Sequence, residues 1–335
     1  MTAVAPLVSV LMPSYNCESF VRDSIQGILN QKFTDFEFII INDGSTDDTG
    51  KEIQAFNDSR IRYYENETNL GLIKSLNHGL LLTRGKYILR TDADDIALEN
   101  MMENLVFFME NNPDYIICGA NMKLLDGEKI FRYPNEDDEL KVFTLGACPF
   151  SHSTVMFRRE VVIKYGLRYN EAIKDGEDHG LWSEMLPYGK FKNLDEVTLL
   201  YRESPTQVTS SVNYKVNYVL ARKYIFEKQA RQYFDLGPSD CERYSRFITG
   251  DYPVIRDELV LTGRLLLSIL KVNSNRRLFN QKRLNRFFFI KWHSTCARAI
   301  CQPLLLFLIY ARFALLSSNI PRPQILLNAI MAKAK

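Results

Sequence analysis

The feature that most constrains the fold is an alternation of short apolar runs with helix-like segments in the first part of the chain. The apolar runs occupy residues 7–12, 36–41, 61–64 and 87–89, and each has the length and composition of a buried strand. Between them, residues 17–31 and 71–83 carry apolar side chains at helical spacing, and residues 45–48 open a further helix with a pattern like a capping box. This order predicts an α/β fold with a largely parallel sheet and helices on both faces.

Polar side chains gather where the predicted strands end, and ligands bind at that edge of α/β sheets. These residues are Tyr15, Asn16, Asp43, Asp92, Asp94 and Asp95. Along extended backbone Asp92 and Asp94 share one face, so together they offer hard oxygen ligands to a divalent cation. A helix start explains the same acids equally well, because residues 98–110 look helical and Asp94 or Asp95 is placed to cap them. The three acids alone leave both interpretations open.

The second part of the chain has a different pattern. Strands are predicted at residues 115–120, 122–125, 130–133 and 154–157, with a hairpin turn at Asp126 and Gly127. A helix is expected to begin near residues 175–179, and from Val212 onward the chain is expected to be mainly helical. We therefore predict two regions, an α/β domain over residues 1–212 and a helical C-terminal region over residues 213–335.

Length and cysteine usage narrow the class of protein. With 335 residues, 46% of them hydrophobic, the chain can bury one large core and a smaller additional one. The six cysteines are scattered without a Cys-x-x-Cys pair, which argues against a zinc site and a disulfide framework and favours a reducing cytoplasm. Residues 1–6 contain no basic segment, so we expect no secretory signal.

The charge is distributed unevenly along the chain. The net charge is only +2, but Glu258 is the last acidic residue, and thirteen of the 42 Lys and Arg residues follow it. The first 258 residues therefore carry 29 basic against 40 acidic side chains, a net of about −11. The two parts of the chain are expected to face different partners.

Several short motifs occur in a fixed order along the first 211 residues. They are Val-Ser-Val-Leu-Met-Pro-Ser-Tyr-Asn (8–16), Asn-Asp-Gly-Ser-Thr-Asp-Asp-Thr (42–49), Asn-Leu-Gly (69–71), Ser-Leu-Asn (75–77), Thr-Asp-Ala-Asp-Asp (91–95), His-Ser-Thr-Val-Met-Phe-Arg (152–158), Gly-Glu-Asp (176–178), and Tyr201-Arg202 with Gln207. Each alone is weak, but together and in order they resemble the inverting nucleotide-sugar glycosyltransferases of family 2, of the bacterial surface-polysaccharide type. The resemblance implies the GT-A fold, a Rossmann-like, mostly parallel sheet flanked by helices.

The resemblance implies a nucleotide site at the first two strand ends. Tyr15 is expected to stack on the base and Asp43 to accept a hydrogen bond from it, and an aromatic face with an acceptor carboxylate suits a uracil ring. Pro13 and Asn16 are expected to help bind the same donor. The alternatives are a packing role for Tyr15 at the strand end and a turn or cap role for Asp43.

The resemblance also favours the metal interpretation of the central acids. Asp94 is expected to be the ligand of Mn²⁺ or Mg²⁺, while Asp92 holds the ribose or the outer shell of the metal, and Arg90 is expected to bind the donor with them. A metal that bridges the diphosphate stabilises the negative charge that grows as the nucleotide leaves. Asp95 remains a candidate helix cap.

The base of the reaction is expected at the second acid of the Glu-Asp pair, Asp178. Inversion requires a base that takes the proton of the attacking hydroxyl on the face opposite the departing phosphate. The alternative for Asp178 is a charge that complements the dipole of the helix it begins. His152 is assigned either a contact with acceptor or phosphates or a purely structural role.

Two departures from the family pattern affect the predicted function. Arg202-Glu203-Ser204 replaces Arg-x-His, and no Gln-x-x-Arg-Trp sequence marks a processive synthase, so transfer of one sugar is expected. The predicted function is transfer from a nucleotide-diphosphate sugar, such as a UDP-sugar, to a hydroxyl of a lipid-linked or glycan acceptor in surface-polysaccharide synthesis. One alternative is a nucleotidyltransferase, but this chain lacks the Gly- and Lys-rich loop expected for that class. The other alternative is an inactive membrane-bound interaction protein.

The C-terminal region predicts contact with a membrane surface. Basic residues surround Phe287, Phe288, Phe289 and Trp292, and the apolar stretch 303–310 is too short to span a bilayer. Cations attract anionic lipid headgroups, and aromatic and leucine side chains are expected to insert at the interface. The alternatives are a buried core helix and a nucleic-acid patch, and we expect no nucleic-acid partner. The predicted location is the inner face of the cytoplasmic membrane, as a peripheral protein.

Overall fold

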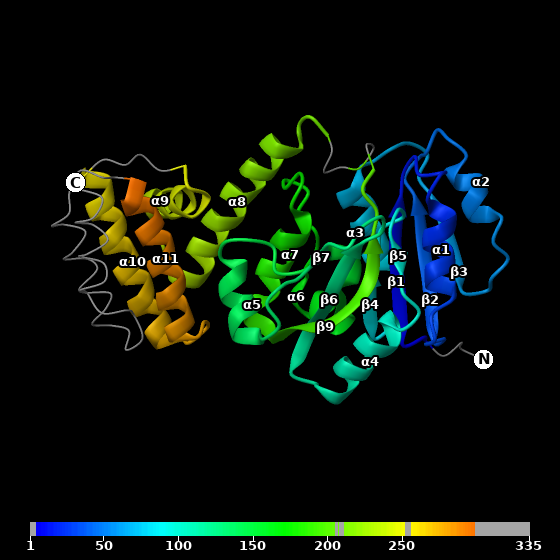
Figure 1. Ribbon diagram of the computed structural model, residues 1–335, viewed down its shortest axis with the longest axis horizontal. Coiled ribbons are helices and arrows are strands. Elements are labelled where there is room, and N and C mark those ends of the chain that lie inside the picture. The colour runs from blue at the N-terminus through cyan, green and yellow to red at the C-terminus, as the bar shows by residue number, and fades with distance from the viewer. Residues whose placement is uncertain (1–4, 205–206, 208–210, 252–255, 299–335) are drawn as a thin grey trace. The chain divides into compact units, whose positions relative to one another are not determined.

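The computed structural model describes residues 5–204, 207, 211–251 and 256–298. The chain divides into two compact units, Met1–Ala221 and Arg222–Lys335 (Figure 1). The predicted division at residue 212 lies just before helix α8 (Tyr214–Phe234), whereas the boundary between the two units falls within that helix.

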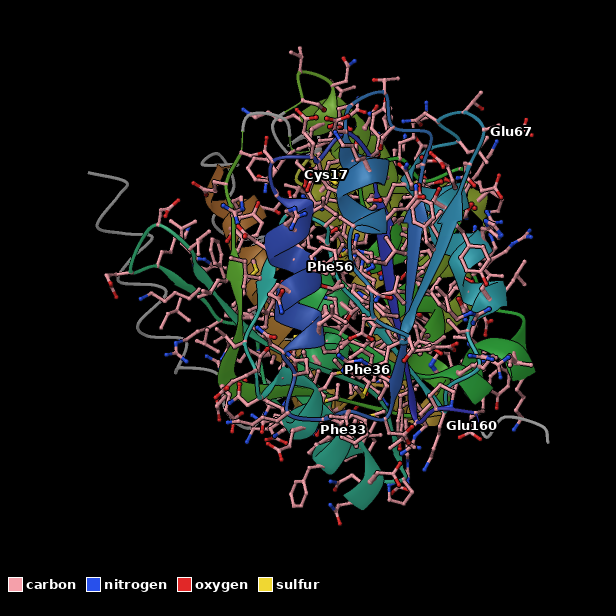
Figure 2. All side chains as sticks on the ribbon, turned by 90° about the vertical axis from the view of Figure 1, so that its right-hand side faces the viewer. Cys17, Phe33, Phe36, Phe56, Glu67 and Glu160 are labelled. Carbon is pink, nitrogen blue, oxygen red and sulfur yellow. The ribbon has the colours of Figure 1, made fainter. Side chains whose placement is uncertain are left out.

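The first part of the chain forms the expected parallel strands and intervening helices. The strands are β1 (Val8–Ser14), β2 (Phe36–Asn42), β3 (Ile61–Glu65) and β4 (Tyr87–Arg90), and the helices are α1 (Val21–Leu29), α2 (Thr49–Gln54) and α3 (Leu72–Leu82). β1 pairs in parallel with β2 on one side and with β4 on the other, and β2 pairs in parallel with β3. Figure 2 shows Cys17 and Glu67, which follow β1 and β3, at one edge of the sheet, and Phe36, where β2 begins, at the other.

Helices cover both faces of this sheet, as predicted. The side chains of β1 alternate in direction, so each face of the sheet presents apolar side chains that a helix can bury. Val10 and Met12 belong to a buried cluster with Ile25 of α1 and Met101 of α4 (Met101–Asn111). On the other face Leu11 lies so close to Gly79 of α3 that a Cβ on that glycine would be 2.1 Å from a Leu11 methyl carbon. A larger residue at position 79 would therefore force the Leu11 side chain to shift.

β1 continues through Pro13 to Ser14, beyond the apolar run at residues 7–12 that predicted it. Pro13 pairs with Ile41 and Ser14 pairs with Asn42, whereas pairing with β4 ends at Leu11. At Pro13 the strand has a neighbour on one side only, and such a position tolerates a residue that has no backbone N–H.

The second part of the chain extends the same sheet with mixed strand directions. The added strands are β5 (Ile96–Ala97), β6 (Tyr115–Leu124), β7 (Ile130–Phe131), β8 (Met156–Arg158) and β9 (Lys190–Tyr201). Within the described residues the order is β3-β2-β1-β4-β8-β6-β9-β5, with β7 beside β6. β8 is antiparallel to both β4 and β6, while β6 and β9 are parallel to each other. The two strands predicted at residues 115–120 and 122–125 are one long strand, β6, which ends at Leu124.

Asp94 and Asp95 do not cap the helix that follows them. The helix, α4, begins at Met101 with Asn100 as its N-cap residue, and β5 separates it from the two acids. The side chain of Gln31 serves its first turn instead, since Gln31 Oε1 accepts a hydrogen bond from the Met102 N–H at 2.9 Å. The cap interpretation of these acids is therefore wrong, because the short strand carries the chain away before the helix begins.

The buried carboxylate of Glu37 links several segments at the end of the sheet where β1 and β2 begin. Glu37, on β2, accepts hydrogen bonds from Ser9 Oγ at 2.6 Å, from Arg62 Nη1 at 2.6 Å, and from the backbone N–H and Nε of Arg84 at 2.9 Å each. Burial acts to raise the pKa of Glu37, but these donors outweigh it and hold the pKa below its usual value of 4.5.

Replacement of Glu37 with Gln is expected to destabilise the protein by about 2 to 4 kcal/mol, because two arginines lose the charge that compensates them. A lowered pKa in the folded state means that the carboxylate stabilises above the ordinary pKa of 4.5 and that this contribution is lost as the pH falls below it. Urea unfolding at pH 7 and pH 4 should therefore show a larger difference between wild type and variant at pH 7. Glu67→Gln, at an exposed loop position, serves as the control and should leave stability unchanged.

The second unit consists of helices in the described residues. It contains the end of α8 together with α9 (Pro238–Thr249), α10 (Arg256–Arg276) and α11 (Gln281–Arg298). Its core includes Phe288, which is fully buried and lies 6.3 Å from the ring of Tyr244, and Trp292, which lies 6.3 Å from the ring of Phe247. The prediction that these two aromatic side chains insert into a membrane is therefore wrong, because helix packing already covers them.

The rest of the predicted membrane-binding tail is not tested by the described residues. The apolar stretch 303–310 lies outside the described residues. No helix in the described part of the chain is both long enough and apolar enough to cross a bilayer.

Candidate active site

The strand ends of β1 and β2 form one side of the candidate site. Tyr15, directly after β1, leaves 46% of its surface exposed, so its ring is available to a ligand. Asn16 has a positive φ of 45° and is held by the next strand end, since its N–H donates to Ser45 Oγ at 3.0 Å and its Oδ1 accepts from the Thr46 N–H at 2.9 Å. Pro13 is buried in β1. Asn16 thus fixes the turn that presents Tyr15.

The capping-box pattern at residues 45–48 does not cap a helix. Asp48, the N-cap residue of α2, makes no side-chain cap hydrogen bond, while Asp47 Oδ1 accepts from the Thr49 N–H at 3.0 Å. Ser45 and Thr46 serve the turn at Asn16 instead.

Asp43 lies at the end of β2 and is almost fully buried. Its Oδ1 accepts from Asn66 Nδ2 at 2.7 Å and from the Leu70 N–H at 3.0 Å, and its Oδ2 accepts from the Gly71 N–H at 2.8 Å. These bonds anchor the loop that leads into α3, which is the turn-type role considered for Asp43 from the sequence. Each carboxylate oxygen can accept more than one hydrogen bond, so a ligand is not excluded from this group.

Asp92 follows β4 and is oriented by two neighbours. Arg90, buried with 2% of its surface exposed, forms an ion pair with Asp92 Oδ2, and Ser153 Oγ donates a hydrogen bond to the same oxygen. Burial acts to raise the pKa of Asp92, but the Arg90 guanidinium holds it below its usual range. The Arg90 guanidinium therefore orients the Asp92 carboxylate and favours its ionised form.

Asp94 and Asp95 point to different surroundings. Asp94 is half-buried and its Oδ2 accepts from Gln207 Nε2 at 3.3 Å, whereas Asp95 is buried and its Oδ1 accepts from the Arg202 N–H at 3.1 Å. Burial and the neighbouring Asp92 raise the pKa of Asp94 to about 6, and burial with Asp92 and Asp94 raises that of Asp95 to about 8. Asp95 is thus a structural residue that fixes the segment after β9.

The donor set fits a divalent cation that is held jointly with a substrate. In the described residues no group of three or more His, Cys, Asp or Glu side chains is arranged to enclose a metal ion. A cation bound through one or two carboxylates, substrate phosphates and water needs no such enclosure. Asp94, half-buried beside a second acid, supplies hard oxygen atoms of the kind that Mg²⁺ and Mn²⁺ prefer.

Asp178 lies in the first turn of α7 (Glu177–Met185). The helix begins after Gly176, whose φ of 134° is a conformation that side-chain-bearing residues rarely adopt. Asp178 Oδ1 accepts from the His179 N–H at 2.6 Å, and Oδ2 accepts from the thiol of Cys148 at 3.1 Å. Burial and the adjacent Asp178 raise the pKa of Cys148 well above its usual value, so the thiol keeps its proton and acts as a donor.

One short turn contacts both Asp92 and Glu177, the neighbour of the predicted base Asp178. The 3₁₀ turn η1 (His152–Thr154) places Ser153 on Asp92, while His152 Nδ1 lies 3.5 Å from Glu177 Oε1 and His152 Nε2 lies 3.0 Å from Tyr169 Oη. Burial acts to raise the pKa of Glu177, but His152 lowers it to about 2. Residues after β4, in η1 and on α7 are thus linked to one another, and His152 contacts both Glu177 and Tyr169.

Sequence reasoning missed several members of this network. Ser153 belongs to a quoted motif but was given no role, and its contact with Asp92 spans 61 positions in the sequence. Cys148 and Tyr169 carried no signal, because a single cysteine or tyrosine outside any motif has no pattern by which a partner could be inferred.

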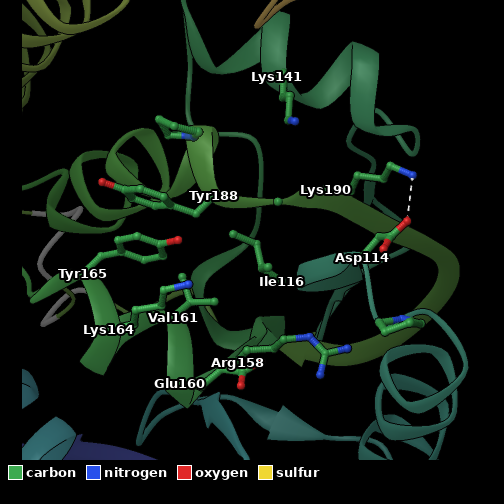
Figure 3. Close-up of a pocket in the computed structure, with 13 residues that line it drawn as sticks. Asp114, Ile116, Lys141, Arg158, Glu160, Val161, Lys164, Tyr165, Tyr188 and Lys190 are labelled. Atoms are coloured by element: carbon green, nitrogen blue, oxygen red, sulfur yellow. Dashed lines mark hydrogen bonds and ion pairs between the residues drawn. The ribbon is translucent and has the colours of Figure 1, made fainter.

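A cleft of about 630 Å³ lies elsewhere, at the opposite edge of the sheet, among Lys141, Lys164, Tyr165, Tyr188 and Lys190 (Figure 3). Lys190 is paired there with Asp114 at 3.3 Å, and the rings of Tyr165 and Tyr188 stack 3.7 Å apart. None of the predicted site residues lines this cleft. The predicted donor-binding residues Tyr15, Asp43 and Asp92 lie at the other edge, where β1, β2 and β4 end.

Comparisons with known proteins identify the family of this chain. Residues 9–166 match Glycosyl transferase family 2. An uncharacterized glycosyltransferase of Haemophilus influenzae is 33% identical over 226 residues, which cover 63% of this chain and 70% of the relative. The O-antigen biosynthesis glycosyltransferase WbnJ of Escherichia coli is 32% identical over 212 residues, which cover 59% of this chain and 80% of the relative.

Solved structures show the same fold at low sequence identity. Residues 1–349 of S. aureus TarS, in complex with UDP-GlcNAc, superpose with a TM-score of 0.60 at 17% identity, over 86% of this chain and 88% of TarS. The mannosyltransferase PcManGT of Pyrobaculum calidifontis, in complex with GDP-Man and Mn²⁺, gives a TM-score of 0.56 at 14% identity, over 94% of this chain and 87% of that one. The fold and the relatives define a glycosyltransferase enzyme of the GT-A type. The chain belongs to glycosyl transferase family 2.

Proposed function

We propose that the protein transfers one sugar from a nucleotide-diphosphate sugar to a hydroxyl group, with inversion at the anomeric carbon, in the synthesis of a surface polysaccharide. The observation that carries this proposal is the η1 turn, which ties Asp92 to the neighbour of Asp178 and so joins a donor-binding group to a candidate base. The relative WbnJ is an O-antigen biosynthesis enzyme, and this supports the assignment to polysaccharide synthesis.

Donor binding is assigned to the ends of β1, β2 and β4. The exposed ring of Tyr15 stacks on the base, with Pro13 and Asn16 shaping the turn, and Asp43 accepts a hydrogen bond from the base. Asp92, oriented by Arg90, takes the ribose. A UDP-sugar is the favoured donor, and the UDP-GlcNAc complex of TarS, which has the same fold, supports this choice.

Asp94 is assigned as the protein ligand of Mn²⁺ or Mg²⁺. When bound, the metal stabilises the charge that develops on the departing diphosphate. The Mn²⁺ in the complex of PcManGT supports a metal in this fold.

Asp178 is assigned as the base. Its Oδ2 accepts the weak thiol hydrogen bond from Cys148, and each carboxylate oxygen retains lone-pair capacity for the proton of an acceptor hydroxyl. Removal of that proton as the hydroxyl oxygen attacks the anomeric carbon, on the face opposite the departing phosphate, gives the inverted product. The acceptor is a glycan or a lipid-linked sugar.

A thermal-shift panel of UDP-, GDP- and dTDP-sugars with Mn²⁺ tests the proposal. A bound donor stabilises the folded protein by mass action, so at 100 times the Kd the gain is about 2.7 kcal/mol and the melting temperature rises. We expect the UDP-sugars to raise it and the effect to shrink with EDTA. If no nucleotide sugar shifts the melting temperature at millimolar concentration, the proposed function is wrong.

We also propose peripheral binding to the anionic inner face of the cytoplasmic membrane. The second unit exposes cationic side chains on α10, on α11 and in the loop between them, among them Lys271, Arg286 and Arg277. Each contributes roughly 1 kcal/mol near an anionic surface, so replacing all three with Gln is expected to weaken binding to vesicles with anionic lipid by roughly 100-fold at low salt. Vesicle co-sedimentation measures this loss.

A matched triple replacement supplies the control for the vesicle experiment. Lys51, Arg132 and Lys174 are exposed on the first unit, and changing them to Gln removes the same amount of charge. Equal loss of binding in both triple variants would indicate a non-specific charge effect, and wild-type protein that ignores anionic vesicles at low salt would contradict membrane binding altogether.

A further inference from the structure

Three tyrosine side chains lie near the candidate base, Asp178. We name Tyr133, Tyr214 and Tyr218 the tyrosine cluster. Tyr214 and Tyr218 lie one turn apart on α8, with ring centroids 5.5 Å apart and planes inclined by 13°, so the two rings stack on each other and form one aromatic patch. All three side chains are half-buried, which leaves part of each in contact with solvent.

Packing around α7 holds this cluster next to Asp178. A Cβ placed on Gly176, two residues before Asp178, would lie 3.8 Å from the ring of Tyr218. Asn217, between the two stacked tyrosines, donates from Nδ2 to Asp175 Oδ2 at 2.8 Å, which fixes the start of α8 against the loop before α7. The aromatic surface is therefore attached to the same loop that presents the base.

The hydroxyl groups of Tyr133 and Tyr214 remain protonated and able to donate. Burial, with Tyr218 and Asp178 nearby, raises the pKa of Tyr214 to about 12. Burial, with Cys148 and Asp178 nearby, also raises the pKa of Tyr133. The phenols of Tyr133 and Tyr214 can therefore donate a hydrogen bond to a ligand oxygen and accept one from a ligand hydroxyl.

Charge selects the kind of ligand that this surface accepts. Asp175, Glu177 and Asp178 all contribute to the pKa shift of Tyr214, so the surface lies in a negative field. A phosphate placed here would be repelled, whereas a neutral ring with apolar C–H faces and peripheral hydroxyls gains both stacking and hydrogen bonds.

We propose that the tyrosine cluster is the acceptor subsite and that it binds a neutral glycosyl residue, which stacks on the rings of Tyr214 and Tyr218 with one hydroxyl directed to Asp178. This inference rests on the proposed transfer function and adds the class of the acceptor group. It assigns recognition of the acceptor to the sugar itself, even where that sugar is carried on a lipid.

Acceptor binding is tested on protein saturated with UDP and Mn²⁺, with methyl glycosides of glucose, galactose, N-acetylglucosamine and rhamnose as probes in saturation-transfer NMR. Wild type is expected to bind at least one probe. Tyr214→Leu removes the aromatic face and is expected to raise the Kd of that probe by roughly 10-fold, while Tyr214→Phe keeps the face and is expected to change it less than about threefold. Tyr165→Leu, at the stacked pair in the opposite cleft, is the matched control and should bind like wild type (Figure 3).

Thermal shift by UDP and Mn²⁺ on the same variants separates this inference from the proposed function. Tyr214→Leu should keep the full UDP shift while losing the glycoside. The subsite is disproved if wild type binds none of the glycosides, if Tyr214→Leu binds them as tightly as wild type, or if it loses the UDP shift as well. Absence of a UDP shift in wild type instead rejects the donor assignment on which the subsite depends.

Discussion

Replacing Asp178 with Asn is expected to reduce the turnover number by roughly 100-fold or more while donor affinity stays at the wild-type level. A base acts on the acceptor proton in the transition state, so its loss affects kcat and leaves binding of the nucleotide intact. The amide occupies the same volume and can still accept a hydrogen bond from the thiol of Cys148, so the start of α7 should keep its structure. Steady-state kinetics with varied donor concentration separates the two effects.

The helix-dipole interpretation of Asp178 is tested by a matched variant. Asp138 lies in the first turn of α5 (Asp137–Thr144), as Asp178 lies in the first turn of α7. If Asp178 only complements a dipole, Asp178→Asn and Asp138→Asn should each cost about 0.3–1 kcal/mol of stability and leave turnover unchanged. Wild-type turnover in Asp178→Asn would therefore reject the assignment as a base.

Replacing Asp94 with Asn is expected to nearly abolish transfer, by roughly 1,000-fold, because a metal stabilises the leaving diphosphate by several kcal/mol. The effect should also be visible without turnover. UDP with Mn²⁺ should raise the melting temperature of wild type more than UDP with EDTA does, whereas the variant should show the same small shift in both.

A chelator and a distant acid provide the controls for Asp94. Excess EDTA should silence the wild-type enzyme, and full activity under that condition would rule out a metal-dependent mechanism. Asp114→Asn removes an acid that is paired with Lys190 at the opposite edge of the sheet, and it should leave both activity and the Mn²⁺ effect unchanged (Figure 3).

Glu177 and Asp178 are adjacent acids in one motif, but they have different partners. Glu177 Oε1 faces His152, which lowers the pKa of Glu177 to about 2, whereas Asp178 Oδ2 faces the thiol of Cys148. The two side chains leave the first helical turn in different directions, because neighbouring residues on a helix lie about 100° apart. The structure therefore gives the two acids different neighbours, and only Asp178 contacts the thiol of Cys148.

The sequence by itself determined the local parts of this protein. Apolar runs with polar ends predicted β1 to β4, and the alternation with helical segments predicted a parallel arrangement, so the edge that carries Tyr15, Asp43 and Asp94 followed from strand direction alone. These features depend on side-chain spacing over a few residues, which a single sequence records directly.

The tertiary structure alone decided how those parts combine. The antiparallel insertion of β8 between β4 and β6 brings Ser153 onto Asp92, and the packing of α7 brings Cys148 onto Asp178, across 61 and 30 positions of the chain. The same packing assigned Asp95 to Arg202 and gave the cap of α4 to Gln31. Such pairings depend on strand order and on which faces are buried together, and these are properties of the whole core that no local spacing encodes.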